Sequence, residues 1–368
     1  MKKRAMVCGV GNMGKAITWA MSHLGFHVVA VDKEKDQIKN FRLGDVDFLH
    51  AENQAGLERA IILSNPDVVI SSLPYHQTLP VAVFCINKGY NYCDLGGRVD
   101  VSKRINEETR VGRNKNYTFT DLGLAPGWVN ILAEYGFREL SKKGKTVNSV
   151  KMMVGGLPSV PFNPPMNYLV SWSLDGLLNE YEDNCKILVN GVETEVAGLD
   201  GLESVRTKSL GQLEAFYTSG GASHSIESMK NRNVKDCFYK TLRYPGHCNL
   251  VKFLIRNCKI DKECLIKIFR DSCLKPSNIH DAVVIKVEIN AGNEIWEKEI
   301  FVSGNMLFGG MQKATSFPIS SIAKMMAEGF FNGSPSKGLS YEDVNYEEFF
   351  KNIETLRLGV MDPSYERA

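Results

Sequence analysis

Three glycines and one aspartate near the start of the chain have the spacing of a dinucleotide site. Gly9, Gly11 and Gly14 follow a short apolar run, and Asp32 closes the next apolar run. The first glycine permits a tight turn, the second lets backbone N–H groups approach a pyrophosphate, and the third lets the following helix pack closely on a sheet. The pattern predicts a bound dinucleotide with its pyrophosphate at the N-terminus of that helix.

Asp32 also favours NAD over NADP as the dinucleotide. Its carboxylate would accept hydrogen bonds from the adenosine ribose hydroxyls and repel a 2′-phosphate. The adjacent Lys33 weakens this preference without reversing it. The residues expected beside the cofactor are Gly9, Gly11, Asn12, Met13, Gly14, Asp32, Lys33, Ser72, Leu73 and Pro74. The alternative is a domain of the same fold whose glycine turn is only structural.

Strand-like and helix-like segments alternate around this motif. The patterns predict strands at 67–72, 90–94 and 117–121, and helices at 52–63, 80–88 and 101–115, with helix or loop between 33 and 51. This alternation is typical of an α/β fold with a doubly wound parallel sheet of the Rossmann type. Ser72, Asp94 and Asp121 then end their strands at the carboxyl edge of the sheet, where ligands bind in such folds.

The pattern changes in the second part of the chain. Strands are expected at 147–154, 283–289 and 294–302, and helices at 172–181 and 318–329. Asn190-Gly191 predicts a tight hairpin, and a second hairpin is expected about Ala291-Gly292-Asn293. We therefore expect an α+β domain with a mostly antiparallel sheet.

The composition argues against several classes of protein. The 368 residues carry 44 basic and 42 acidic side chains, so the net charge of +2 indicates neither nucleic acid nor membrane as a partner. No apolar run approaches the ~20 residues of a membrane span. The nine cysteines form no C-x-x-C pair, which favours reduced thiols in a cytoplasmic protein. The scattered histidines predict no metal site.

Several motifs together resemble the saccharopine dehydrogenase-like family, most closely its lysine 6-dehydrogenase branch. Besides the glycine turn, they are Tyr92-Cys93-Asp94-Leu95-Gly96-Gly97, Ala125-Pro126-Gly127, Gly155-Gly156-Leu157-Pro158, Trp172-Ser173, Glu180-Tyr181, Thr218-Ser219-Gly220-Gly221 and Arg243-Tyr244-Pro245-Gly246-His247. Pro74-Tyr75-His76 is more similar to saccharopine reductases than to lysine oxidisers.

The resemblance implies three parts of the chain. These are a dinucleotide-binding Rossmann domain at 1–127, an inserted α+β substrate and oligomerisation domain at 128–313, and a C-terminal helix and tail at 314–368 that return to the first domain. It also implies NAD(P)-dependent chemistry at the C–N bond of an amino-acid amine, and a homodimer or homotetramer. We expect oxidation of L-lysine at its ε-carbon. The alternatives are a saccharopine reductase, a carboxy(nor)spermidine dehydrogenase, or an NAD-binding regulatory protein without turnover.

That chemistry needs a base for the amine and an anchor for a distant carboxylate. Arg243 suits a bidentate carboxylate clamp, and His247 suits proton transfer near neutral pH. Tyr75 and Asp121 are further catalytic candidates, with loop packing and turn capping as their structural alternatives. Other residues expected to contact the substrate are Asp94, Arg98, Tyr168, Trp172, Thr218 and Ser219, and His224 is a weaker candidate. Each of these could instead serve only in packing, surface ion pairs or loops.

Overall fold

The structure is a computed structural model that describes residues 2–35, 37, 44–112, 116–164, 166–273, 279–333 and 335–361. The chain divides into two compact units. The first comprises Met1–Trp128 and Gln312–Ala368, and the second comprises Val129–Met311. None of the described helices is both long enough and apolar enough to cross a membrane.

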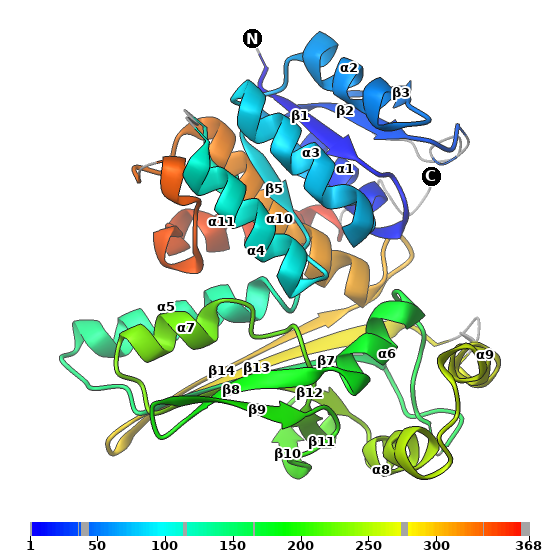
Figure 1. Cartoon of the computed structure of the whole chain (residues 1–368), viewed down its shortest axis with the longest axis vertical. Helices are drawn as coiled ribbons and strands as arrows, with labels where there is room; N and C mark the ends of the chain where they lie inside the picture. Colours follow the sequence, from blue (N-terminus) through cyan, green and yellow to red (C-terminus); the bar gives the residue numbers. More distant parts are fainter. Residues whose placement is uncertain are drawn as a thin grey trace. The chain divides into compact units, whose positions relative to one another are not determined.

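The first unit contains a six-stranded parallel sheet, which confirms the predicted doubly wound fold (Figure 1). Its strand order is β3-β2-β1-β4-β5-β6. The strands are β1 (Arg4–Cys8), β2 (His27–Asp32), β3 (Val46–His50), β4 (Val68–Ser71), β5 (Tyr92–Asp94) and β6 (Thr118–Phe119). The helices are α1 (Asn12–His23), α2 (Gln54–Ser64), α3 (Tyr75–Lys88), α4 (Val99–Val111), most of α10 (Gly310–Glu328) and α11 (Tyr346–Gly359).

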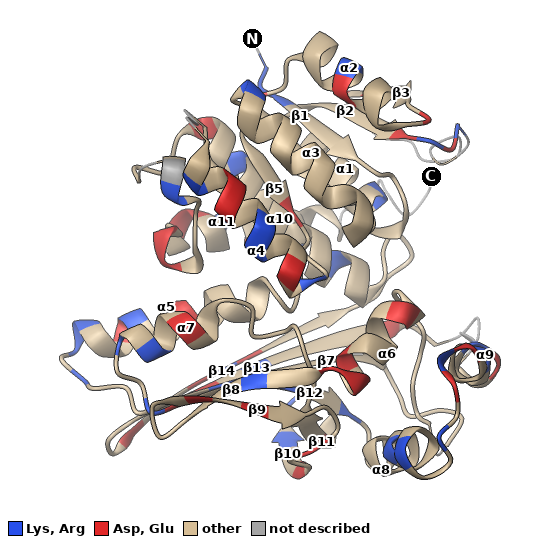
Figure 2. Ribbon diagram, in the orientation of Figure 1, with Lys and Arg blue, Asp and Glu red and all other residues tan. Residues whose placement is uncertain are grey.

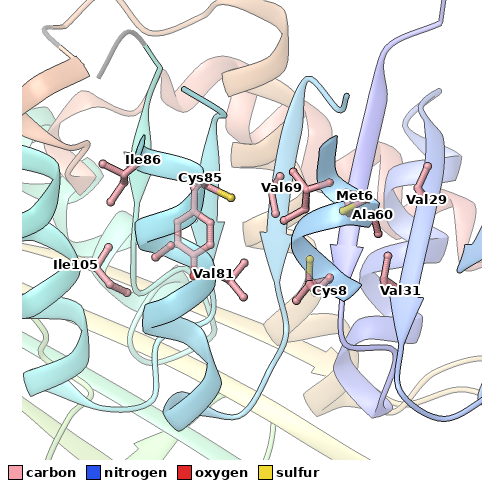
Figure 3. Close-up of a cluster of buried hydrophobic side chains, with 14 residues drawn as sticks. Met6, Cys8, Val29, Val31, Ala60, Val69, Val81, Cys85, Ile86 and Ile105 are labelled. Carbon is pink, nitrogen blue, oxygen red and sulfur yellow. The ribbon is translucent and has the colours of Figure 1, made fainter. Parts of the chain in front are cut away.

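Buried apolar side chains from both strands and helices form the core between this sheet and the helices on one face. Met6 and Cys8 from β1 and Val69 from β4 meet Val81 and Cys85 from α3 in this cluster (Figure 3). Strands buried on both sides read as continuous apolar runs, which is why the sequence predicted them clearly. The core therefore fixes the carboxyl ends of β1 and β4 beside the glycine turn.

The largest differences from the predicted elements concern β3, α3 and α10. β3 lies in the segment expected to be helix or loop, α3 begins at Tyr75 rather than residue 80, and α10 begins at Gly310 rather than residue 318. Each helix contains an internal proline, Pro80 or Pro318, which removes one backbone donor. Burial of the neighbouring residues outweighs that loss, because Val81 and Ile319 are both 0% exposed.

The second unit contains an eight-stranded, mostly antiparallel sheet, as predicted. Its main path is β10-β11-β12-β7-β13-β14, and β8 pairs with both β12 and β9. β12 and β7 are parallel neighbours. The strands are β7 (Ser149–Pro158), β8 (Asn184–Val189), β9 (Val192–Ala197), β10 (Glu203–Thr207), β11 (Gly211–Tyr217), β12 (Asp236–Arg243), β13 (Asp281–Ala291) and β14 (Glu294–Ser303).

Both predicted hairpins are present. Asn190 and Gly191 have positive φ angles of 50° and 79° between β8 and β9, as a two-residue hairpin turn requires. β13 and β14 pair through Ala291 and Glu294. The helices of this unit are α5 (Trp128–Lys142), α6 (Leu174–Glu182), α7 (Ser225–Asn231), α8 (His247–Lys252) and α9 (Lys262–Ser272), with a π-helix at Phe253–Asn257.

Candidate functional site

The glycine turn between β1 and α1 leaves open space in which a ligand can approach the protein backbone. A Cβ at Gly14 would lie 1.9 Å from the Gly9 carbonyl oxygen, and one at Gly9 would lie 2.9 Å from the Ser72 carbonyl oxygen. Gly9 also has a φ of 88°. A Cβ at Gly11 would meet nothing within 4 Å. The protein itself thus requires Gly9 and Gly14, whereas Gly11 leaves room for a pyrophosphate.

The N-terminus of α1 adds positive potential to this space. Gly11 is the N-cap residue, and no side chain caps the helix at this end. The first N–H groups of a helix carry a partial positive charge, which suits an anion. The exposed Asn12 and half-buried Met13 lie in this first turn, as expected of cofactor neighbours. These residues fit the phosphates of a dinucleotide.

Asp32 stands at the end of β2 and is bonded to the turn. Its carboxylate accepts a hydrogen bond from the Val10 N–H at 2.5 Å and another from the Glu34 N–H at 2.9 Å. The side chain remains partly exposed, and Lys33 beside it is exposed. The Asp32 carboxylate is therefore held at the strand end, where a ribose would lie, with lone pairs left over for hydroxyl groups.

Ser72, Leu73 and Pro74 follow β4 at the same edge of the sheet. The Ser72 N–H donates to the Cys8 carbonyl at 2.8 Å, and the Leu73 side chain lies against Gly9. The structure thus brings together the predicted cofactor residues of the glycine turn and of the segment after β4. Their contact with a nucleotide stays a prediction.

Tyr75 and Arg98 lie close together in the first unit. The Arg98 guanidinium carbon is 5.7 Å from the centre of the Tyr75 ring, and Tyr75 is 43% exposed. Arg98 Nε also donates to Asp100 at 3.0 Å. Both side chains follow carboxyl ends of neighbouring strands, β4 and β5. This accessible pair is placed where a ligand of the sheet edge could reach it.

Asp94 and Asp121 are instead buried within their turn, at 1% and 6% exposure. Asp94 accepts hydrogen bonds from the N–H groups of Gly96 at 2.9 Å and Asp121 at 3.2 Å. Asp121 accepts from the Ser102 hydroxyl at 2.6 Å. Burial and the neighbouring Asp121 charge raise the pKa of Asp94 to about 7. This geometry favours the turn-holding alternative over substrate contact for both carboxyl groups.

In the second unit, Arg243 and His247 meet through a third residue. Arg243 Nε donates to the Tyr181 hydroxyl at 3.1 Å, and that hydroxyl lies 3.0 Å from His247 Nε2. His247 Nδ1 lies 2.8 Å from the Met166 carbonyl. A carbonyl can only accept, so Nδ1 carries the proton and Nε2 accepts from Tyr181. The three side chains therefore form one directional hydrogen-bond chain.

His247 is fully buried, and both nitrogens of its ring are engaged in the hydrogen bonds described above. Burial, aided by the Arg243 charge, lowers the pKa of His247 to about 3. The imidazole is therefore neutral at physiological pH and already committed to two hydrogen bonds. The arrangement supports a role in holding Tyr181 and Arg243, rather than the proton transfer that the sequence suggested.

Arg243 is 3% exposed, yet its hydrogen-bonding capacity is not exhausted. Nη1 donates to the Leu242 carbonyl at 2.9 Å, and the guanidinium lies 4.8 Å from the centre of the Tyr168 ring. Nη2 has no hydrogen-bond partner among the residues that the structure describes. A guanidinium whose Nε and Nη1 are hydrogen-bonded and whose Nη2 is unpaired keeps donors that a carboxylate can accept.

Of the other predicted substrate residues of this unit, Tyr168 lies against Arg243. The Trp172 indole N–H donates to the Tyr168 hydroxyl at 3.1 Å, which joins Trp172 to the residue beside Arg243. The Thr218 hydroxyl pairs with that of Thr241 at 2.7 Å and is buried. Ser219 instead caps the end of α6 through its N–H, which donates to the Glu180 carbonyl at 3.0 Å. We find no indication that Thr218 offers a free hydroxyl to a ligand.

Glu180 and Tyr181 belong to a motif that carries the family resemblance, but neither was predicted to be a site residue. Burial raises the pKa of Glu180 to about 8, although the Arg243 charge opposes that rise. Its spacing of three residues from the buried Leu177 places it towards the covered face of α6. That spacing was the available signal, but a glutamate in a short helix is most often an exposed residue. Among the described residues, no group of acidic, histidine and cysteine side chains is arranged to hold a metal ion.

A parallel six-stranded sheet with a ligand-accessible glycine turn defines a dinucleotide-binding α/β protein, and comparison with known proteins identifies its family. Residues 5–118 match the saccharopine dehydrogenase NADP binding domain, and residues 123–355 match the saccharopine dehydrogenase C-terminal domain. The chain therefore belongs to the saccharopine dehydrogenase family. Its first unit is an NAD(P)-binding domain, and the preference between the two nucleotides stays a prediction.

Individual relatives agree with this assignment. The chain is 25% identical over 253 residues to the saccharopine dehydrogenase [NADP(+), L-glutamate-forming] of Schizosaccharomyces pombe, covering 68% of this chain and 55% of that protein. It is 28% identical over 271 residues to the mitochondrial alpha-aminoadipic semialdehyde synthase of Bos taurus, covering 71% of this chain and 29% of that protein. The chain thus spans about half or less of the length of these relatives.

A solved structure shows the same fold. The apo saccharopine dehydrogenase (L-Glu forming) of Saccharomyces cerevisiae superposes with a TM-score of 0.73, covering 95% of this chain and 96% of that one. The sequence identity is 15%, so this likeness concerns the fold alone.

Proposed function

We propose that this protein is an NAD(P)-dependent oxidoreductase that acts on the C–N bond of an amino-acid amine. The observation that carries the proposal is Arg243, a buried guanidinium with one nitrogen unpaired, in a chain whose other unit is an NAD(P)-binding domain. A buried arginine is costly unless its charge is used, and a carboxylate is the ligand that best matches its planar fork.

In this proposal each part of the chain has a separate task. The glycine turn and the start of α1 bind the dinucleotide, which accepts or supplies the hydride when bound. Arg243 binds a carboxylate of the substrate far from the reacting carbon and so limits its motion. Tyr181 and His247 position Arg243 through the hydrogen-bond chain. Tyr75, beside Arg98, is the exposed candidate for proton transfer in the first unit.

For the substrate we propose L-lysine, oxidised at its ε-carbon to an imine that water hydrolyses to the aldehyde and ammonia. Saccharopine is a second candidate, because the Schizosaccharomyces pombe and Saccharomyces cerevisiae relatives are named saccharopine dehydrogenases. Saccharopine carries more carboxylates than lysine and would need cationic partners in addition to Arg243. A carboxy(nor)spermidine dehydrogenase would instead accept substrates with an additional amine.

A single spectroscopic screen tests the activity. Purified protein is mixed with NAD or NADP and, in turn, with lysine, saccharopine and a carboxylated polyamine, and reduced nicotinamide is followed by its absorbance. Amine-dependent reduction supports the proposal, and the amine that gives the highest kcat/KM identifies the substrate. Binding of NADH without turnover of any amine or of the corresponding aldehyde would instead indicate a regulatory protein.

We also propose that the second unit forms a homodimer or homotetramer. Its sheet ends at β14, an edge strand with the exposed side chains Ile295 and Phe301, at 68% and 45% exposure. Natural proteins usually cover or pair such an edge. Light scattering across micromolar concentrations would show a multiple of the chain mass, whereas a monomer at every concentration would refute assembly.

A further inference from the structure

Glu180 has a carboxyl group without a partner among the described residues, inside a cluster of polar and aromatic side chains. It lies in the last turn of α6, a helix that carries several acidic residues (Figure 2). Its backbone carbonyl is bonded to Ser219, but its side chain has no hydrogen bond or ion pair with any described residue. The side chain is only partly exposed. A carboxylate in such a position ordinarily finds a donor, because burying it alone is costly.

The surroundings of Glu180 contain one cation and several neutral groups. The titratable side chains that interact with it electrostatically are Arg243, Tyr168, Tyr181, Tyr239 and Cys185. Arg243 is the charged member of this set. Glu180 and Arg243 influence each other but form no direct ion pair. Arg243 is bonded through Nε, at 3.1 Å, to Tyr181, the residue that follows Glu180 in α6. Arg243 also keeps Nη2 without a partner, so an unused acceptor and an unused donor lie in the same cluster.

An α-amino acid presents the complementary pair of groups on one carbon atom. We propose that Glu180 and Arg243 together bind the head group of an α-amino acid, with the ligand ammonium donating to Glu180 and Arg243 Nη2 donating to the ligand carboxylate. This inference deepens the proposed function, on which it rests, because it names an intact α-amino-acid head group as the part of the substrate that the second unit recognises. Glu180 thereby selects against carboxylic acids that lack the amine.

The proposal has a consequence for protons. Because burial raises the pKa of free Glu180 to about 8, the group is mostly protonated at neutral pH. An ammonium beside it stabilises the carboxylate and lowers that pKa, so the proton leaves to solvent on binding. At pH 7 the release would be about 0.9 proton per ligand, and it would vanish well above pH 8.

Isothermal titration calorimetry in two buffers of different ionisation enthalpy measures this release. The ligands are L-norleucine, which has the head group but no ε-amine, and hexanoate, which has the same carbon chain without the α-amine. Wild-type protein should release a proton with norleucine and none with hexanoate. Glu180→Gln should weaken norleucine at least about ten-fold, abolish its proton release and leave hexanoate unchanged. Glu182→Gln, on the exposed end of the same helix, should behave as wild type.

The wild-type measurement keeps the test independent of how the variants fold. Norleucine binding without proton release at pH 7, or no norleucine binding, would overturn the inference. So would an unchanged norleucine affinity in Glu180→Gln. Turnover is measured separately by the formation of reduced nicotinamide. If wild type reduces NAD(P) with an amine and Glu180→Gln binds norleucine as tightly as wild type, the head-group role alone is refuted. Norleucine binding with proton release but no reduction of NAD(P) by any amine refutes the proposed function alone.

Discussion

The two units of the protein build their binding residues by opposite means. In the first unit the ligand space arises from missing side chains: Gly11 leaves it open, and Gly9 and Gly14 allow the backbone to turn beside it. In the second unit the residues proposed to bind the substrate are two polar side chains, Arg243, which is hydrogen-bonded to the distant Tyr181, and Glu180. The backbone shape of the glycine turn thus provides the expected binding surface in the first unit, and polar side chains provide it in the second.

The two units also differ in how their buried acidic side chains are bonded. Asp94 and Asp121 lie in the unit where the backbone provides the binding surface, and their carboxyl groups bond to backbone N–H groups and Ser102. Glu180 lies among side chains and has no such bonds. A raised pKa accompanies a turn-holding role in Asp94, whose Oδ1 accepts from two backbone N–H groups while its buried Oδ2 has no partner in the part of the chain that the structure describes. In Glu180 it accompanies a carboxyl group with no hydrogen bond to any described residue. Burial alone does not distinguish the two, but the hydrogen-bond partners do.

The largest expected effect concerns Asp94 and the pH dependence of stability. Its folded pKa of about 7 exceeds the unfolded value of 3.8, so the folded state holds a proton that the unfolded state has lost. The contribution of Asp94 to stability is thus fully present below pH ~4 and is lost as the pH rises to ~7, by on the order of 4 kcal/mol. In Asp94→Asn the free energy of unfolding, taken from urea unfolding curves at several pH values, should change less between pH ~4 and ~7 than in wild type.

If the free energy of unfolding changes equally with pH in wild type and Asp94→Asn, Asp94 does not hold a proton in the folded protein. Dinucleotide affinity near pH 6 should change little in this variant, since the Asp94 carboxyl group bonds to the Gly96 and Asp121 N–H groups and is not among the predicted cofactor residues. A large loss of affinity there would weaken the contrast between the two units.

The next effect tests shape in the glycine turn. Gly14→Ala places a Cβ 1.9 Å from the Gly9 carbonyl, so the turn must shift. We expect destabilisation by about 2–3 kcal/mol and loss of measurable dinucleotide binding. Gly11→Ala is the matched control, because its Cβ meets no protein atom within 4 Å. It should keep the melting temperature and still weaken the dinucleotide, whereas unaltered binding in Gly11→Ala would show that the phosphates lie elsewhere.

Charge geometry in the second unit is tested by Arg243→Lys. Lysine keeps the positive charge but loses the planar fork and the bond to Tyr181. We expect kcat/KM for the amino-acid substrate to fall about 100-fold, through orientation as well as affinity. The matched comparison is an amine without a carboxylate, such as cadaverine in the case of lysine. An equal loss for both amines would make Arg243 a structural residue only.

These same differences decide what could be predicted from the sequence. The parallel sheet, both hairpins and the glycine turn depend on short-range patterns, and the structure contains them. The starts of α3 and α10 were misplaced because tertiary burial of Val81 and Ile319 overrides the nearby prolines. The Arg243–Tyr181–His247 chain spans 66 residues from Tyr181 to His247. No local pattern reports that His247 lies inside the core or that Glu180 lies near Arg243.

A smaller effect is expected when that chain loses its central hydroxyl. Tyr181→Phe leaves His247 Nε2 and Arg243 Nε without their partner in a buried place. The free energy of unfolding should fall by about 1–2 kcal/mol, and KM for the amino acid should rise as Arg243 loosens. Tyr217→Phe is the control, since Tyr217 is only partly buried and its hydroxyl makes no hydrogen bond with a described residue. Equal losses of stability in both variants would show that the hydrogen bonds of Tyr181 with Arg243 and His247 do not stabilise the protein.

The smallest expected effect concerns Asp32 and the choice of nucleotide. In our prediction its carboxylate accepts from ribose hydroxyls and repels a 2′-phosphate, so wild-type protein binds NAD more tightly than NADP. Asp32→Ala should weaken NAD about ten-fold and narrow the difference between the two, because the charge-assisted hydrogen bonds and the repulsion disappear together. The Val10 and Glu34 N–H groups also lose their acceptor, so the melting temperature must be recorded in parallel. Dissociation constants from fluorescence titration measure the effect, and tighter binding of NADP by wild type would refute this role of Asp32. The expected loss in Asp32→Ala would instead show that a charge contributes to nucleotide binding in the first unit together with the backbone shape of the glycine turn.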